Sequence, residues 1–217
     1  MKKIGVVLSG CGFRDGSEIH EAVCTLLAID QADAEAVCMA PDIPLQEVNH
    51  LRMEATGATR NVLIESARIA RGNILDIATV HAEDLDALLL PGGFGAALNL
   101  CNFAQKGADA DVNPEVARLV REVHAAAKPI GAMCIAPALI AAILGKTAAP
   151  LLTIGTDAGT AAEINKTGAH HQSCPVQGII IDQQNKLVTT PAYMLAGRIS
   201  EVHEGVSACV KAVLELI

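Results

Sequence analysis

Short apolar runs alternate along the whole chain with longer segments in which apolar residues recur every three or four positions. An unbroken aliphatic run bounded by turn residues predicts a strand that is buried on both faces of a sheet. A second pattern near the end of the chain, two short apolar runs around a polar connection, predicts a hairpin. Strands are expected at residues 4–8, 34–40, 85–90, 129–133 and 151–154, and the hairpin at residues 179–182 and 187–190.

The segments between these strands have the apolar spacing of amphipathic helices. They cover residues 18–30, 61–71, 114–127, 137–144 and about 192–217. Ser17 is the predicted N-cap of the first helix, and Gly145 the predicted end of the fourth. Because strands and helices alternate, we expect a three-layer α/β/α sandwich with a mostly parallel sheet. No linker or repeat interrupts the pattern, so a single domain over residues 1–217 is predicted.

The composition agrees with helices packed on a parallel sheet and excludes several classes of protein. Of the 217 residues, 51% are hydrophobic, only 2% are aromatic and 18% are charged, with a net charge of −8. A nucleic-acid binder needs a basic surface and stacking rings, and a disordered chain is more highly charged. No apolar run approaches the roughly 18 residues of a membrane span. We therefore expect no nucleic-acid partner and no membrane partner.

The beginning of the chain and its cysteines bear on the compartment. Two lysines followed by a short apolar stretch resemble a signal peptide, but polar residues follow at once without a small-residue cleavage site. We expect a buried strand there instead. Seven scattered cysteines, an odd number, do not form a disulfide framework. A reducing environment follows, and a cytoplasmic location is predicted.

Parallel sheets bind ligands at the carboxyl ends of their strands. The loops there are residues 9–17, residues 91–103 and the turns that follow residues 133 and 154. The three phenylalanines, Phe13, Phe94 and Phe103, all lie in these loops. Their clustering predicts the lining of a pocket, with packing over the ends of the sheet as the alternative.

Cys134 stands where a short strand runs directly into a helix. Gly131, Ala132 and Ala136 surround it, and such small residues are needed where a sharp strand-to-helix turn exposes a nucleophile. The helix amino terminus would favour a thiolate there, and the amide of Ile135 could stabilise an oxyanion. A small buried hydrophobe is the structural alternative for a lone cysteine. We predict that Cys134 is the nucleophile.

Two further groups could serve such a sulfur. The segment Leu90-Pro-Gly-Gly-Phe-Gly ends a neighbouring strand, and the amides of Gly92 and Gly93 could complete the oxyanion site; a plain glycine-rich turn is the alternative. Glu18 and Glu21, one turn apart at the start of the first helix, are candidate proton carriers. Either could instead be an ordinary charge at a helix amino terminus.

Together these segments resemble the ThiJ/PfpI branch of the class I glutamine amidotransferase-like superfamily, and within it the ElbB-like subfamily (enhancing lycopene biosynthesis, sigma cross-reacting protein). The resemblance rests on residues 4–12, 15–21, 90–96, 133–137 and 189–193. It implies a flavodoxin-like sandwich, a nucleophile-elbow cysteine at Cys134 and a protonated glutamate against it, often in a homodimer. Glu21 matches the glutamate position, with Glu18 as the alternative, and Phe94 lies in the implied substrate-binding segment.

The chain departs from its relatives in its histidines. Glutaminases of the superfamily carry a His-x-Glu pair after the cysteine, whereas the only such pair here, at residues 81–83, precedes it. The protease-like relatives place a histidine directly after the cysteine, where this chain has Ile135. His170 and His171 are weak candidates for a base. A working glutaminase is therefore not expected.

The resemblance implies a cofactor-independent, glutathione-independent glyoxalase of the lyase class, linked to isoprenoid biosynthesis. Its substrate would be a small 2-oxoaldehyde, glyoxal or methylglyoxal, converted to glycolate or lactate through the Cys134 thiolate and Glu21. The alternative is a regulatory or redox-sensing module whose exposed, low-pKa Cys134 is oxidised.

Two other classes fit poorly. A dinucleotide fingerprint after the first strand would need glycine where the chain has Asp15, and the negative charge would repel a pyrophosphate. A zinc-binding helix would need a second histidine after His203, but position 207 is serine, and there is no Cys-x-x-Cys. No cofactor and no metal are expected.

Overall fold

A seven-stranded sheet forms the middle layer of the protein in the computed structural model, which describes residues 1–217. Its strands lie in the order β10, β11, β7, β6, β1, β2, β5, and all neighbours are parallel except the β10–β11 hairpin. The strands are β1 (Lys3–Val7), β2 (Glu35–Ala40), β5 (Leu75–Asp76), β6 (Ala87–Leu90), β7 (Ile130–Met133), β10 (Ile180–Asp182) and β11 (Leu187–Thr190). The predicted parallel sheet and its antiparallel edge hairpin are confirmed.

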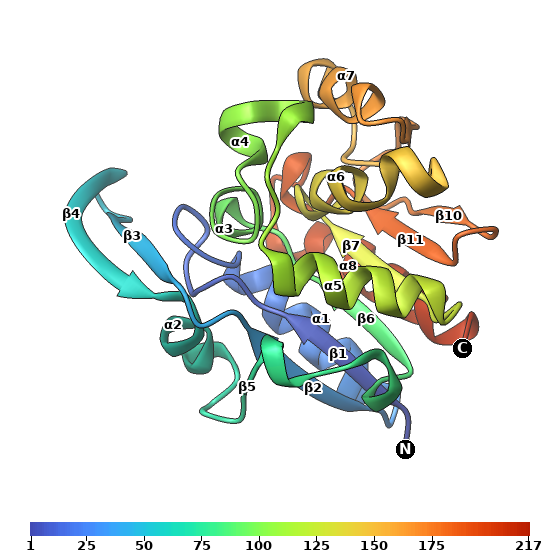
Figure 1. The fold of residues 1–217 in the computed structure, drawn as a ribbon, viewed down its shortest axis with the longest axis horizontal. Helices are drawn as coiled ribbons and strands as arrows, with labels where there is room; N and C mark the ends of the chain where they lie inside the picture. Colours follow the sequence, from blue (N-terminus) through green and yellow to red (C-terminus); the bar gives the residue numbers. More distant parts are fainter.

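Helices cover both faces of this sheet (Figure 1). One face carries α1 (Ile19–Gln31), α2 (Val62–Ile69) and α8 (Ile199–Glu215). The other carries α3 (Phe94–Leu98), α4 (Phe103–Lys106), α5 (Pro114–Ala125), α6 (Ala136–Ala148) and α7 (Ala158–Lys166). Four short 3-10 helices join them: η1 (Ile77–Thr79), η2 (Ala82–Asp84), η3 (Gly107–Asp109) and η4 (Ala192–Met194). The flavodoxin-like three-layer α/β/α sandwich is thus observed.

Alternate residues of each inner strand enter two separate hydrophobic cores, because successive strand side chains point to opposite faces. On β1, Val6 packs with α1 and α8, whereas the next residue, Val7, packs with α5 and α6. Both are almost fully buried. The unbroken aliphatic run of the strand therefore reflects burial on both faces.

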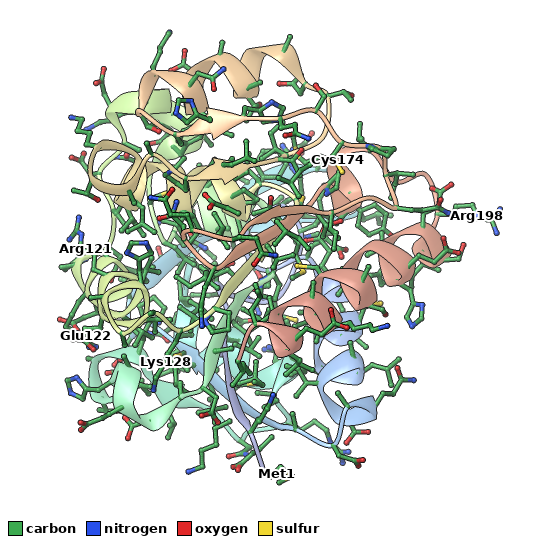
Figure 2. All side chains as sticks on the ribbon, turned by 90° about the vertical axis from the view of Figure 1, so that its right-hand side faces the viewer. Met1, Arg121, Glu122, Lys128, Cys174 and Arg198 are labelled. Atoms are coloured by element: carbon green, nitrogen blue, oxygen red, sulfur yellow. The ribbon has the colours of Figure 1, made fainter.

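Most charged side chains lie outside these cores, and the fully buried Glu21 is an exception. Figure 2 shows Arg121 and Glu122 on the outer side of α5, and Met1 at the end of the molecule opposite α7. None of the helices combines the length and the apolar character required to span a bilayer.

Two small additions lie beside the sheet. A hairpin of β3 (Pro44–Asn49) and β4 (Glu54–Asn61) projects from the body (Figure 1), and β8 (Leu151–Leu152) pairs with β9 (His170–His171). The strand expected at residues 151–154 is therefore shorter and lies outside the main sheet. The projecting hairpin was not predicted, because its strands are mostly polar and only Leu45 is fully buried.

Three predicted helix boundaries are wrong. Glu18, not Ser17, is the N-cap of α1: its carboxylate accepts the N–H of Glu21 at 2.7 Å, while the Ser17 hydroxyl accepts the N–H of Ser9. Gly145 lies inside α6, where the absence of a side chain lets the backbone of Thr167 approach. The last helix begins at Ile199, because Ala192 has a left-handed backbone (φ 43°) that cannot continue a right-handed helix.

Candidate active site

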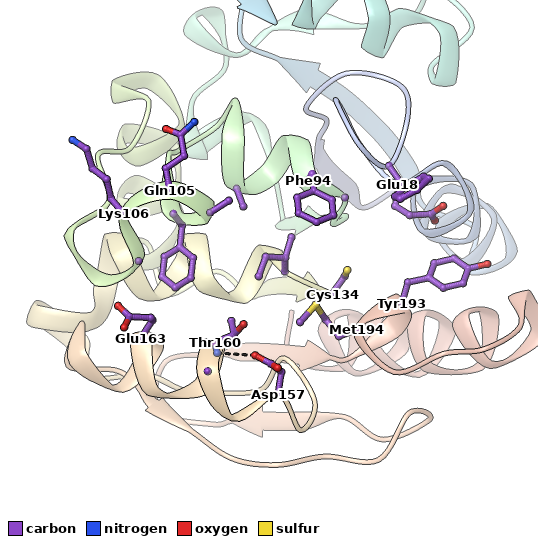
Figure 3. A pocket seen from close by; sticks show the side chains of 18 of the residues that line it. Glu18, Phe94, Gln105, Lys106, Cys134, Asp157, Thr160, Glu163, Tyr193 and Met194 are labelled. Carbon is purple, nitrogen blue, oxygen red and sulfur yellow. Dashed lines mark hydrogen bonds between the residues drawn. The ribbon is translucent and has the colours of Figure 1, made fainter. Parts of the chain in front are cut away.

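A cavity of about 1140 Å³ opens where β1, β6 and β7 end, as expected for a parallel sheet. Phe13, Phe94 and Phe103 all contribute to its lining, so the pocket predicted from the aromatic residues is present. Figure 3 shows Cys134 in this cavity, with Glu18 and Tyr193 on one side of it and Lys106 and Glu163 on the other.

Cys134 occupies the turn between β7 and α6 in a left-handed backbone conformation, with φ of 60°. This conformation is uncommon for a residue with a side chain and is found at strained functional turns. Ala132 and Ala136 beside it are completely buried, and larger side chains would not fit. The expected sharp turn is present, and the Cys134 side chain reaches the cavity although the residue is only 7% exposed.

Glu21 is fully buried beneath the cavity and forms a hydrogen bond with the Cys134 thiol. Two backbone amides hold its carboxyl group: Gly92 N–H donates to Oε2 at 2.8 Å, and Tyr193 N–H donates to Oε1 at 3.2 Å. These donors come from the loops after β6 and β11. Together with the turn that carries Cys134, three separate segments therefore converge on the carboxyl group of Glu21.

Burial raises the pKa of Glu21 from 4.5 to about 8, and the nearby negative charge of Glu18 adds to the increase. The hydrogen bonds from Tyr193, Cys134 and Gly92 act in the opposite direction and only partly compensate. A carboxyl group removed from water favours its neutral form. Glu21 is accordingly protonated at neutral pH.

Burial also raises the pKa of the Cys134 thiol well above 9, and the Glu21 carboxyl reinforces the shift. The amides of Gly93 and Ile135 contact the sulfur and lower the pKa, but they do not reverse the shift. The expectation of an exposed thiolate of lowered pKa is wrong, because loss of water outweighs the helix amino terminus. The unliganded site therefore holds a thiol beside a carboxylic acid.

The two glycines after β6 have different surroundings. The amide of Gly92 is occupied by Glu21, and a Cβ at Gly92 would lie 2.5 Å from the Cβ of Cys134. Gly93 has φ of 93°, a conformation that favours glycine, and lines the cavity. The amides of Gly93 and Ile135 thus lie at the sulfur, and their role in binding an oxyanion stays a prediction. Gly92 holds the carboxyl of Glu21 and is not free to bind an oxyanion.

Glu18 and Phe94 also line the cavity. The Glu18 carboxylate caps α1 and lies on the cavity lining. Of the two candidate proton carriers, Glu21 is the one beside Cys134. Phe94 begins α3, and the guanidinium of Arg14 stacks on its ring, 4.7 Å from the centroid.

His20 and Tyr193 line the cavity as well and were not assigned from the sequence. The Tyr193 hydroxyl lies 2.7 Å from Nδ1 of His20. Both residues belong to the segments on which the family resemblance rests, and Tyr193 is the chain's single tyrosine. These two facts could have marked them as candidate site residues.

The two histidines considered from the sequence are elsewhere. His170 and His171 form β9 and are not part of the cavity lining. The ring of His171 accepts the N–H of Ile154 at 3.3 Å, and burial lowers its pKa.

Comparisons with known proteins find relatives that match nearly the whole length of this chain. No family model matches it. The human glutamine amidotransferase-like class 1 domain-containing protein 3, mitochondrial, is 45% identical over 225 residues, covering 99% of this chain and 83% of that protein. The mitochondrial ES1 protein homolog of Rattus norvegicus is 44% identical over 99% of this chain and 84% of its own length.

Among solved structures, an isoprenoid biosynthesis protein with an amidotransferase-like domain from Ehrlichia chaffeensis superposes with a TM-score of 0.94. It is 37% identical, and the match covers 100% of this chain and 99% of that one. A DJ-1 variant from Schizosaccharomyces pombe has the same fold, with a TM-score of 0.60 at 14% identity and coverage of 100% and 92%.

The sandwich, the strand-to-helix turn at Cys134 and these similarities define a protein of the class I glutamine amidotransferase-like fold, which the ThiJ/PfpI and DJ-1 proteins share. Within that class, the chain belongs to the family of glutamine amidotransferase-like class 1 domain-containing (ES1) proteins. The ElbB-like subfamily stays a prediction. A cytoplasmic location also stays a prediction, since the names of the human and rat relatives place those proteins in mitochondria.

Proposed function

We propose that this protein is a cofactor-independent glyoxalase that converts methylglyoxal to lactate and glyoxal to glycolate. The observation that carries the proposal is the buried, protonated Glu21 carboxyl hydrogen-bonded to the Cys134 thiol at the floor of the cavity. A thiol and a proton carrier in contact are the two groups that this internal redox reaction requires.

In the first step the sulfur of Cys134 adds to the aldehyde carbon, forming the carbon–sulfur bond as the carbonyl double bond opens. Glu21 gives its proton to the carbonyl oxygen and takes the thiol proton, so the carboxyl ends the step protonated. The amides of Gly93 and Ile135, which contact the sulfur, would stabilise the negative charge that develops on that oxygen. The product is a hemithioacetal on Cys134.

In the second step Glu21 gives its proton to the oxygen of the second substrate carbon and takes the proton of the first carbon, which forms an enediol. The carboxyl then gives that proton to the second carbon and takes the hydroxyl proton of the first, so it again ends the step protonated. The first carbon is oxidised to a thioester and the second is reduced to an alcohol, so no external oxidant or reductant is needed. Water then cleaves the thioester, which releases the hydroxy acid and restores the Cys134 thiol. The reaction adds one water to the substrate overall.

The first prediction tests the nucleophile. Cys134→Ala is expected to lower glyoxal and methylglyoxal consumption roughly a thousandfold or more, because the covalent intermediate can no longer form. Cys11→Ala is the matched control, since Cys11 is a cysteine in another strand-end loop that does not line the cavity. Equal turnover by wild type and Cys134→Ala, measured as hydroxy acid formed, would refute the proposal.

A redox-sensing role for the same sulfur is less well supported by the site. A thiol that is 7% exposed and has a raised pKa reacts slowly with peroxide, because the thiolate is the reactive form. Intact mass after mild peroxide separates the two functions. Oxidation confined to Cys134 in a protein without measurable turnover would favour the sensor over the glyoxalase.

The link to isoprenoid biosynthesis is also part of the proposal. It is supported by the Ehrlichia chaffeensis protein, whose name carries that term. A glutaminase activity is not proposed, because His81 of the only His-x-Glu segment lies 3.5 Å from Glu122 and outside the cavity lining.

A further inference from the structure

The cavity is much larger than a two- or three-carbon aldehyde requires. Its volume of about 1140 Å³ is larger than the roughly 300–1,000 Å³ of pockets that enclose drug-sized ligands. Methylglyoxal bound at Cys134 would leave most of this space empty. The unused part extends from the sulfur toward α4 and α7, as Figure 3 shows for Lys106 and Glu163.

This unused part, the far arm, has a mainly apolar lining. Phe103 and Ala104 of α4 and Gly159 and Thr160 of α7 line it, and Ile135 and Met194 belong to the same cavity lining. Concave apolar surfaces of this kind bind the hydrophobic body of a ligand, while a few polar groups fix its orientation. A substrate that filled the far arm would gain binding energy that methylglyoxal cannot.

The charges around the far arm are predominantly negative. Asp157 and Glu163 line it, and hydrogen bonds with Thr160 and Lys166 respectively lower the pKa of the two carboxyls, so that both are ionised at neutral pH. The single lining cation, Lys106, is paired with Asp111 at 2.5 Å, and Glu163 is paired with Lys166 at 2.6 Å, so Asp157 is the lining charge of the far arm without an ion-pair partner. A ligand with a carboxylate or phosphate at this end would be repelled.

We propose that the physiological substrate is a larger 2-oxoaldehyde, with its aldehyde carbon at Cys134 and a bulky, mainly apolar body without negative charge in the far arm. The inference deepens the glyoxalase proposal and rests on it for the reaction. The shape and charge of the substrate are inferred from the cavity alone. The binding of a larger substrate and the glyoxalase reaction can therefore be tested separately.

Alkylation of Cys134 tests the far arm without requiring turnover. N-benzyl-2-chloroacetamide should modify Cys134 at least tenfold faster than 2-chloroacetamide, because its ring binds in the far arm before the sulfur reacts. The corresponding 4-carboxybenzyl reagent should lose most of this advantage. Peptide mapping restricts the measurement to Cys134, and free cysteine supplies the intrinsic reactivity of each reagent.

Two variants narrow the far arm. Ala104→Trp and Gly159→Leu both place bulk in it, and Gly159 can accept a side chain because an added Cβ would meet only Asp157 Oδ1, at 3.5 Å. Each should reduce the benzyl advantage at least fivefold. Ala125→Trp, on the exposed end of α5 and outside the lining, is the matched control and should leave the advantage unchanged.

Turnover completes the test. The ratio of kcat/KM for phenylglyoxal to that for methylglyoxal should exceed about ten in the wild type, since one added apolar group is worth roughly ten- to two-hundredfold in a fitted pocket. The ratio should fall in Ala104→Trp and Gly159→Leu. A benzyl advantage that is absent, or unchanged in both variants, overturns the inference even if methylglyoxal is consumed. A clear advantage without any turnover overturns the glyoxalase proposal and leaves the binding site standing.

Discussion

Glu21 is the residue whose chemistry depends most on the fold around it. Its carboxyl is fully buried, accepts two backbone amides and lies against the Cys134 sulfur. Two ionisable groups in contact away from water cannot both carry negative charge at a low cost. The pair therefore keeps its protons at neutral pH, and each proton is available for transfer.

The raised pKa of Glu21 makes a prediction about stability. Between about pH 4.5, the ordinary pKa, and about pH 8, the folded protein binds a proton here that the unfolded chain has lost. Stability from this group is therefore complete below the lower value and declines as the pH rises through the upper one. As the pH rises across this interval, the free energy of unfolding of the wild type should fall by on the order of a few kcal/mol relative to that of Glu21→Gln.

Chemical denaturation of both proteins at several pH values measures this difference. The comparison uses the slope with pH, because the side-chain amide introduced by Glu21→Gln faces two backbone N–H donors and adds a penalty that does not depend on pH. Parallel curves for wild type and Glu21→Gln would show that Glu21 is ionised in the folded protein.

At the residue scale, local sequence was enough for some of the site. Cys134 was identifiable because the small residues needed at its turn are its chain neighbours. The choice between Glu18 and Glu21 was not, since it depends on amides from two distant loops. The direction of the cysteine pKa depends on burial by the whole fold, and the local argument from the helix amino terminus gave the wrong sign.

At the scale of elements, the loops after β1 and β6 are joined through their backbones. Glu18 N–H donates to the carbonyl of Gly92, Phe94 N–H to that of Phe13, and Gly95 N–H to that of Gly16. This places the start of α1, with Glu21, directly beside the turn that carries Cys134. The active-site geometry is thus a property of two interlocked loops.

Gly93 lies in this junction, and its replacement tests how tightly the loops fit. A Cβ on Gly93 would collide with the backbone of Glu18, and φ is 93°. Gly57, on the projecting hairpin, also has a positive φ (80°), but nothing lies within 4 Å of an added Cβ. Gly57→Ala should cost roughly 1–2 kcal/mol of strain.

Gly93→Ala should cost on the order of 2 kcal/mol more than Gly57→Ala, because overpacking is added to the same strain. Thermal or denaturant unfolding of the two variants gives the comparison. Equal losses would mean that the loops can separate without cost.

Elements with a strong apolar period were predictable, and those without one were not. The aliphatic runs of β1, β6 and β7 indicated their burial on both faces. The β3–β4 hairpin has almost no buried face, so no alternation marks it in the sequence. The prediction of a helix end was wrong where a tertiary contact determines the residue, as at Gly145, which is packed against the backbone of Thr167.

At the scale of the whole molecule, the predicted homodimer stays a prediction, and α1 offers a surface for it. Ile19, Val23 and Leu27 are 42%, 49% and 41% exposed and recur every four residues along one side of the helix. An apolar stripe of this kind is typical of interfaces, and two copies could pair it with itself about a two-fold axis.

Light scattering of the wild type should therefore give twice the chain mass, and Val23→Glu should give the mass of one chain. Ile64→Glu, an equally radical change at an exposed position of α2, should leave the larger mass in place. A single-chain mass for the wild type would contradict the dimer.

The hydrogen bond between Phe94 N–H and the carbonyl of Phe13, which helps to join the β1 and β6 loops, involves main-chain atoms alone. The side chains of both residues take no part in that hydrogen bond, and both line the cavity. Evolution, or an engineer, can exchange these rings to admit a different molecule while the frame that aligns sulfur and carboxyl is left intact.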